Sequence, residues 1–202
     1  MHSMGTASWS INVDRWNHCY DRALWIRAAE RINAPAGGIV PGPIDIDQLP
    51  DPPQAEPGKQ VAEGWLAWWH ALLQVPSPTL PGSACPYPVG AFSPPDFSGL
   101  ARWPALHEVV ARRWKTAQEW HSARKRAGVA AMTHHGREPF LVREVERSLG
   151  RRVAPFSLDL VLLPVRNDKI RHVQGTRYLV PEHIYDAPGW AESLRALVVQ
   201  VT

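Results

Sequence analysis

The sequence predicts an α+β fold that is mainly helical, and three features of the 202-residue chain lead to that prediction. Apolar residues recur at helical spacing in five segments, which predicts about five helices. An apolar run over residues 156–165, followed by a β-like stretch up to residue 180, predicts one small antiparallel β-hairpin or sheet. Between Pro35 and Pro95 lie 14 of the 20 prolines, so this region is expected to be mostly connection. With 45% hydrophobic residues the chain can bury a core, and we expect a single domain over residues 1–202.

Two helices are expected in the first half of the chain. The first runs over residues 14–32, with Asp14 as its N-cap and the proline at position 35 beyond its end. The second covers residues 58–74, where one broad arc collects the side chains of Val61, Trp65, Leu66, Trp68, Trp69, Leu72 and Leu73. Two proline-rich arms, residues 34–57 and 76–96, flank this helix. Their apolar side chains indicate that the arms pack over the surface or onto a partner.

The second half contains the other three expected helices and the strands. A long helix is expected over residues 104–128, ended by Gly128, and a further helix over residues 138–150. The strand at 156–165 leads through a turn at 166–169 into one strand or a pair of short strands over 170–180. The last helix begins near Ala187, with Asp186 as its N-cap, and its apolar face comprises Trp190, Leu194, Leu197, Val198 and Val201.

Several function classes are excluded or disfavoured by missing patterns. The sequence has no P-loop, Rossmann glycine pattern, nucleophile elbow, HExxH or EF-hand loop, so no catalytic residue, metal or cofactor is assigned. Cys19 and Cys85 are too few for a disulfide framework or a four-cysteine zinc site. Neither a run of 18 apolar residues nor a secretory signal is present, so we expect a cytoplasmic protein without membrane contact.

Histidines are the residues on which an unrecognised enzyme site would depend. His121, His134, His135 and His183 are the candidates, and none of them has a spacing typical of zinc ligands. His134 and His135 fit a loop between two helices. His183 falls in a connection whose Asp186 is already explained as a helix cap. A histidine-based enzyme is therefore the third of three functional hypotheses.

Charge is divided unevenly along the chain and supports the second hypothesis, a nucleic-acid-contacting accessory factor. Residues 1–100 carry a net charge of −4 and residues 101–202 a net charge of +7. The segment 102–152 holds 12 Arg or Lys and 5 Glu, and its candidate contacts are Arg124, Lys125, Arg126, Arg151 and Arg152. The interleaved glutamates favour a solvated, salt-paired face instead.

Tryptophan leads to the first hypothesis, because 10 Trp outnumber the 4 Tyr and 4 Phe together. Most fit core arcs, but Trp9, Trp16, Trp25 and Trp103 lie off them, where rigid aromatic rings serve as interface anchors. We therefore expect a non-catalytic interaction protein that binds a protein partner or a second copy of itself: an adaptor, scaffold or accessory subunit of a bacterial assembly. The preference for 18 Arg over 4 Lys suggests a GC-rich bacterial genome.

Arg113 is the other candidate partner-binding residue, since it falls in the middle of the long helix's apolar arc. Two interpretations stay open. Its stem packs while the guanidinium reaches the rim over Trp114 or Trp120. Alternatively, it pairs with a carboxylate of the acidic first half, and so docks a proline-rich arm, through Asp45, Asp47, Asp51 or Glu63.

Overall fold

The computed structural model describes residues 9–53, 56–75, 90–131 and 138–201. Within them it contains six α-helices, one short 3₁₀ helix and four strands, so the chain has an α+β, mainly helical fold. The elements in chain order are β1 (Ser10–Asp14), α1 (His18–Ala29), α2 (Lys59–Gln74), η1 (Ser98–Leu100), α3 (Pro104–Ala131), α4 (Glu138–Leu149), β2 (Ser157–Leu163), β3 (Arg171–Gln174), β4 (Arg177–Pro181), α5 (Glu182–Asp186) and α6 (Trp190–Val201).

The four strands form one mixed sheet in the order β1-β2-β4-β3, which corrects the antiparallel sheet expected over 156–180. β1 pairs with β2 and β2 with β4 in parallel, and only the edge strand β3 is antiparallel to its neighbour. The chain passes from β2 to the edge as β3, turns back at Gly175, and inserts β4 between β2 and β3. The sequence predicted β2 and the pair of short strands over 170–180, which are β3 and β4 and pair antiparallel, but it predicted neither β1 nor the parallel pairing of β2.

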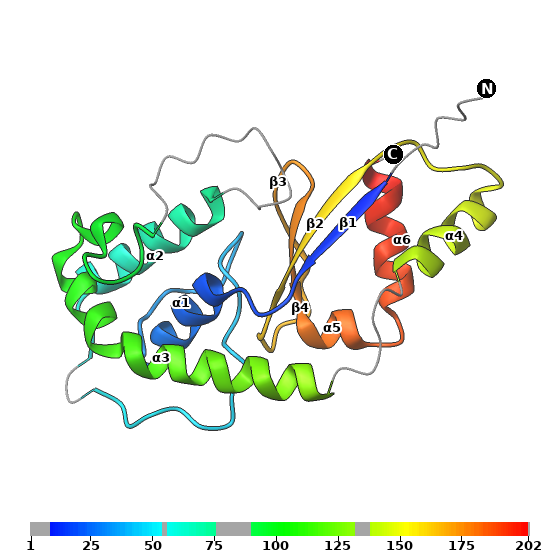
Figure 1. Ribbon diagram of the computed structural model, residues 1–202. Coiled ribbons are helices and arrows are strands. Elements are labelled where there is room, and N and C mark those ends of the chain that lie inside the picture. The colour runs from blue at the N-terminus through cyan, green and yellow to red at the C-terminus, as the bar shows by residue number, and fades with distance from the viewer. Residues whose placement is uncertain (1–8, 54–55, 76–89, 132–137, 202) are drawn as a thin grey trace.

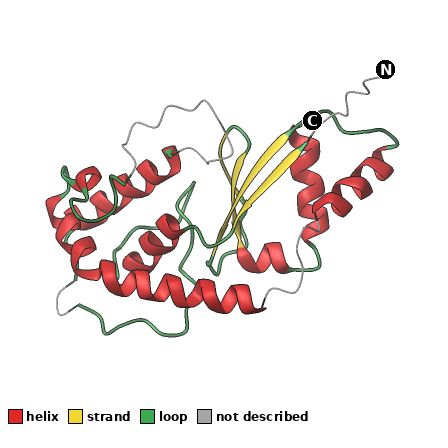
Figure 2. Cartoon of the chain, viewed as in Figure 1, coloured by secondary structure: helices red, strands yellow, loops and turns green. Residues whose placement is uncertain are grey.

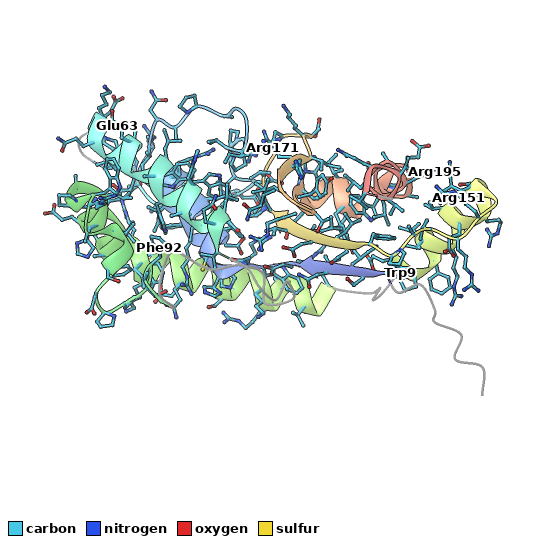
Figure 3. The ribbon with its side chains drawn as sticks, turned by 90° about the horizontal axis from the view of Figure 1, so that it is seen from above. Trp9, Glu63, Phe92, Arg151, Arg171 and Arg195 are labelled. Atoms are coloured by element: carbon cyan, nitrogen blue, oxygen red, sulfur yellow. The ribbon has the colours of Figure 1, made fainter. Side chains whose placement is uncertain are left out.

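Helices cover both faces of this sheet (Figures 1 and 2). Leu158, Leu160 and Leu162 of β2 pack in a cluster with α4 and α6, whereas Val161 and Leu163 join a second cluster built on α1, α2 and α3. β2 is therefore buried on both sides, which explains its continuous apolar run. Figure 3 shows Trp9 and Arg151 toward the α4 end of the molecule, with Glu63 and Phe92 toward the other end.

The junction between β1 and α1 was not expected from the sequence. Asp14 is the last residue of β1, and the N-cap of α1 is Asn17, whose side chain accepts from the backbone N–H of Cys19 at 3.0 Å. Asp14 accepts from the Asn17 amide at 2.6 Å, so it supports the cap from outside the helix. The five-residue strand was hidden because only three residues separate it from α1, so that its end was taken for the start of the helix.

α2 matches its predicted range and holds the first half together. Trp65 and Trp69 are fully buried, with stacked rings 5.5 Å apart. The Trp65 indole N–H donates to the carbonyl of Ala23 at 2.9 Å, and that of Trp69 to the carbonyl of Ile39 at 3.0 Å. The tryptophans of α2 therefore hold both α1 and the first arm.

The described part of the first arm, residues 34–53, packs on this chain. Val40 and Ile44 are buried in the α1–α3 cluster. The Arg27 guanidinium donates to the carbonyls of Pro41 at 3.0 Å and Gly42 at 2.7 Å, and burial lowers its pKa to about 10. Most of the second arm, residues 76–89, lies outside the described residues.

Two further boundaries differ from the prediction. Gly128 does not end α3, which continues to Ala131; a Cβ at Gly128 would lie 2.5 Å from the Trp16 ring, so glycine is needed there for close packing. Asp186 is the last residue of α5 and not the cap of α6. Its carboxylate accepts from Arg15 at 2.5 Å. Among the described residues, no helix has both the length and the apolar character needed to cross a bilayer.

Candidate functional site

A buried carboxylate joins α1 to α3 at the centre of the candidate site. Asp21 is completely buried, and its Oδ2 lies 2.8 Å from Nδ1 of His121 and 2.7 Å from Nη1 of Arg124. His121 and Arg124 are three residues apart on α3, so both side chains project from one face of the helix. That spacing lets one carboxylate receive two donors.

Arg124 extends this cluster to a third helix. Its second terminal nitrogen, Nη2, forms an ion pair with Glu182 at the start of α5, and its guanidinium lies 5.8 Å from the Trp120 ring centroid. The side chain is only 15% exposed. Arg124 thus links α1, α3 and α5, and its role as a nucleic-acid contact stays a prediction.

An open cavity of about 660 Å³ lies beside this cluster, between the beginning of α1 and the second half of α3. The described residues that line it are His18, Arg22, Gln118, His121, Ser122, Lys125, Arg126, Val129 and Ala130. Three of them carry a positive charge at neutral pH, and none of the described lining residues is acidic. The cavity is therefore electropositive, with two imidazole rings in its wall.

The two imidazoles, His18 and His121, have different surroundings. Their ring centroids are 6.3 Å apart, in an edge-to-face arrangement. Partial desolvation lowers the pKa of His18, and the positive charges of Arg22 and His121 lower it further, so His18 is neutral at neutral pH. In the largely buried His121, Nδ1 donates to the Asp21 carboxylate, so Nε2 is the ring nitrogen left for a ligand of the cavity that this residue lines.

A second cavity continues the first along α3. It measures about 520 Å³, and its described lining is Pro94, Trp114, Lys115, Gln118, Glu119, Ser122 and Arg126. Gln118, Ser122 and Arg126 line both cavities, so the two form one depression, which we call the α3 groove. Arg22 bridges them, since its guanidinium lies 4.4 Å from the Trp114 ring centroid.

The other predicted histidines are not brought into this groove. His183 is on α5, where its Nε2 lies 2.7 Å from Asp168, and it lines a separate cavity of about 270 Å³ with Asp45, Asp47 and Glu182. His134 and His135 lie outside the described residues. In the described part of the chain, no group of three or more histidine, cysteine, aspartate or glutamate side chains is arranged to hold a metal ion.

The four candidate tryptophan anchors contact other parts of this chain. Trp25 is 2% exposed and is therefore a core residue, not a surface anchor. Trp9 stacks on Phe156 with ring centroids 6.1 Å apart. The ring of Trp16 packs on Gly128, and Trp103 packs on Gly64, where a Cβ would lie 3.1 Å from its side chain. The other three side chains are half-buried, and a partner-binding role for Trp9, Trp16 and Trp103 stays a prediction.

Arg113 pairs with a carboxylate of the acidic first half, but not with one in the arm. It bonds Glu30, the C-cap residue of α1, whose side chain is 2% exposed. Arg112 donates to the other oxygen of the same carboxylate at 2.9 Å. The ion pair therefore fastens the end of α1 to α3, and the arm is held by Arg27 instead.

The remaining basic candidates divide into two pairs. Lys125 and Arg126 line the first cavity, whereas Arg151 and Arg152 are exposed beyond the end of α4. Sequence reasoning missed His18, Asp21 and Arg22. Their positions i, i+3 and i+4 on one helix were the available signal. These three residues are recognised as part of the site only from their contacts with α3, about a hundred residues later in the chain.

No protein-family model matches this chain, and neither a curated protein nor a solved structure matches it.

Proposed function

We propose that this protein binds a phosphate-bearing anionic ligand in the α3 groove. The observation that carries the proposal is the lining of the first cavity: Arg22, Lys125 and Arg126 surround it together with two histidines, without a described acidic residue. Arg and Lys are the side chains that bind phosphate oxygens through charge-assisted hydrogen bonds.

The buried Asp21 does not cancel this positive field. Its Oδ2 accepts from both His121 and Arg124, so the carboxylate is paired with a cation inside the protein. Glu119, in the wall of the second cavity, lies 4.0 Å from the Lys115 ammonium. Both acids therefore have basic partners, while Lys125 and Arg126 remain exposed to a ligand.

The lining of the α3 groove favours the second and third hypotheses from the sequence over the first. The nucleic-acid hypothesis gains support from Lys125 and Arg126, which share one cavity. The histidine-based hypothesis gains support from His121. The role as an adaptor or accessory subunit gains no such support, because the tryptophans that favoured it pack within the chain. That role stays a prediction, as do the cytoplasmic location and the GC-rich bacterial origin.

Calorimetric titration with inorganic pyrophosphate at low salt tests the proposal. Replacing both Lys125 and Arg126 by Ala should raise the Kd about tenfold or more, since each lost charged contact removes one phosphate donor. Arg151→Ala with Arg152→Ala is the matched control, because it removes the same two charges from an exposed site outside the cavity. Equal loss of affinity in both double variants, or no binding by the unaltered protein, would overturn the proposal.

A further inference from the structure

We infer that the α3 groove cleaves single-stranded RNA, with His18 and His121 as the general base and general acid. The inference rests on the proposed anion binding and names its substrate class. It starts from the placement of the two imidazoles: both line one cavity, and their ring centroids are 6.3 Å apart. Because the two rings lie edge to face in the wall of one cavity, a phosphate group bound against that wall can contact both of them.

The shape of the groove favours a polymer over a small ion. The two cavities, of about 660 and 520 Å³, share three lining residues and extend along α3. Basic side chains occur along the whole depression, from Lys115 through Arg22 and Arg126 to Lys125. An extended strand with a phosphate at each nucleotide matches this distribution of charge.

The surroundings assign different roles to the two histidines. Arg22, His121 and Lys125 place positive charge near His18, and Asp21 is the negative charge that faces it; desolvation and the cations prevail, and lower the pKa of His18. His18 therefore accepts a proton at neutral pH. Nδ1 of His121 lies 2.8 Å from the Asp21 carboxylate, which fixes the orientation of the ring, and we assign proton donation to its other nitrogen, Nε2.

The chemical step is complete with groups of the enzyme and the substrate. His18 removes the proton from a ribose 2′-hydroxyl, and the 2′-oxygen forms a bond to the neighbouring phosphorus. The bond from phosphorus to the 5′-oxygen breaks, and His121 gives its proton to that oxygen. The products are a 2′,3′-cyclic phosphate and a 5′-hydroxyl end. Arg22, Lys125 and Arg126 stabilise the negative charge that develops on the phosphoryl oxygens.

The test compares a labelled single-stranded RNA with a 2′-O-methyl strand of the same sequence. The unaltered protein should bind both strands and cleave only the RNA, and mass spectrometry should find the cyclic phosphate end. His18→Ala should lower the cleavage rate about a hundredfold or more with little change in the affinity for the 2′-O-methyl strand. His70→Ala, which removes an exposed histidine on α2, is the control and should cleave normally.

The rate should also fall as the pH drops below the pKa of His18, because only the neutral imidazole accepts the proton. Binding of both strands without cleavage overturns this inference and leaves the proposed anion binding intact. Failure to bind either strand, together with failure to bind pyrophosphate, overturns both. Cleavage that persists in His18→Ala and in His121→Gln assigns the activity elsewhere and also overturns the inference.

Discussion

Two buried carboxylates, Asp159 on β2 and Asp21 on α1, show how similar chemistry serves a closed interior and an open site. Asp159 accepts from Asn12 and from Arg177, each at 2.7 Å. Arg177 also donates from another nitrogen to the carbonyls of Leu73 and Val75 at the end of α2. None of these residues lines the cavities described above. The charged pair of this cluster, Asp159 and Arg177, is therefore buried and connects the sheet with α2.

Asp21 differs from Asp159 in one donor. Arg124 turns inward as Arg177 does, but the second donor is His121, whose ring also forms part of a cavity wall. A histidine has a nitrogen on each side of its ring, so it can be held by a buried acid and still act on a ligand. The partner of a buried acid therefore distinguishes a structural cluster from a candidate site.

The largest effect is expected at the closed cluster. Arg177→Met leaves Asp159 buried without a cation, and removes a donor from the end of α2, so the free energy of unfolding should fall by about 3 to 5 kcal/mol. Urea denaturation measures the change. Arg166→Met is the control, because its pair with Asp45 is exposed and is worth about 1 kcal/mol or less. Equal losses in the two variants would show that the Asp159 cluster is not specially stabilising.

The next effect concerns the Glu30 pair, which has two cations for one buried acid. Arg113→Met alone leaves Arg112 on the carboxylate and should cost about 1 to 2 kcal/mol, which is comparable to one charged hydrogen bond. Replacing both arginines by Met should cost about 3 to 5 kcal/mol, more than the sum of the single changes, because the buried charge is then unpaired. Strictly additive losses in the double variant would contradict this expectation.

The smallest effect is expected at Asp14, which lies between the two clusters. Burial raises the pKa of Asp14, and the charges of Asp159 and Asp21 raise it further, although the bond from Asn17 opposes this shift. The folded state therefore binds a proton more tightly than the unfolded chain, so ionisation of Asp14 lowers stability as the pH rises from the ordinary aspartate pKa through the raised one.

Asp14→Asn removes that loss and keeps an oxygen that can accept from Asn17. The variant should be more stable than the original chain at neutral pH, and the difference should vanish in acid, below the ordinary aspartate pKa. Thermal melts over a pH series measure it. A variant that is less stable at neutral pH would show that the Asp14 charge is needed for the cap.

The sequence predicts local elements better than the partners of buried charges. α2, α3 and α4 follow from apolar side chains at helical spacing, and their ranges agree closely with the structure. α1 is buried on most sides, so it has no single apolar face to mark its boundary with β1. β2 pairs in parallel with β4 because β4, the last strand in the chain, is inserted between β2 and β3. Sequence patterns do not show this insertion.

The candidate site was predicted only in part for the same reason. His121, Lys125 and Arg126 were named among candidates, but they are neighbours on one helix and were assigned to separate hypotheses. Asp21 and His18 complete the site from a helix about a hundred residues earlier. Only tertiary packing joins the two groups, because no periodicity or spacing in the sequence encodes it.

NMR of the imidazole nitrogens during titration with inorganic pyrophosphate tests whether the cavity between α1 and α3 is an open anion site. We predict that the resonances of His18 and His121 shift together along one saturating curve, while those of His70 and His172 stay in place. Shifts spread evenly over all histidines, or no shift at His18 and His121 at saturating ligand, would contradict an anion site there.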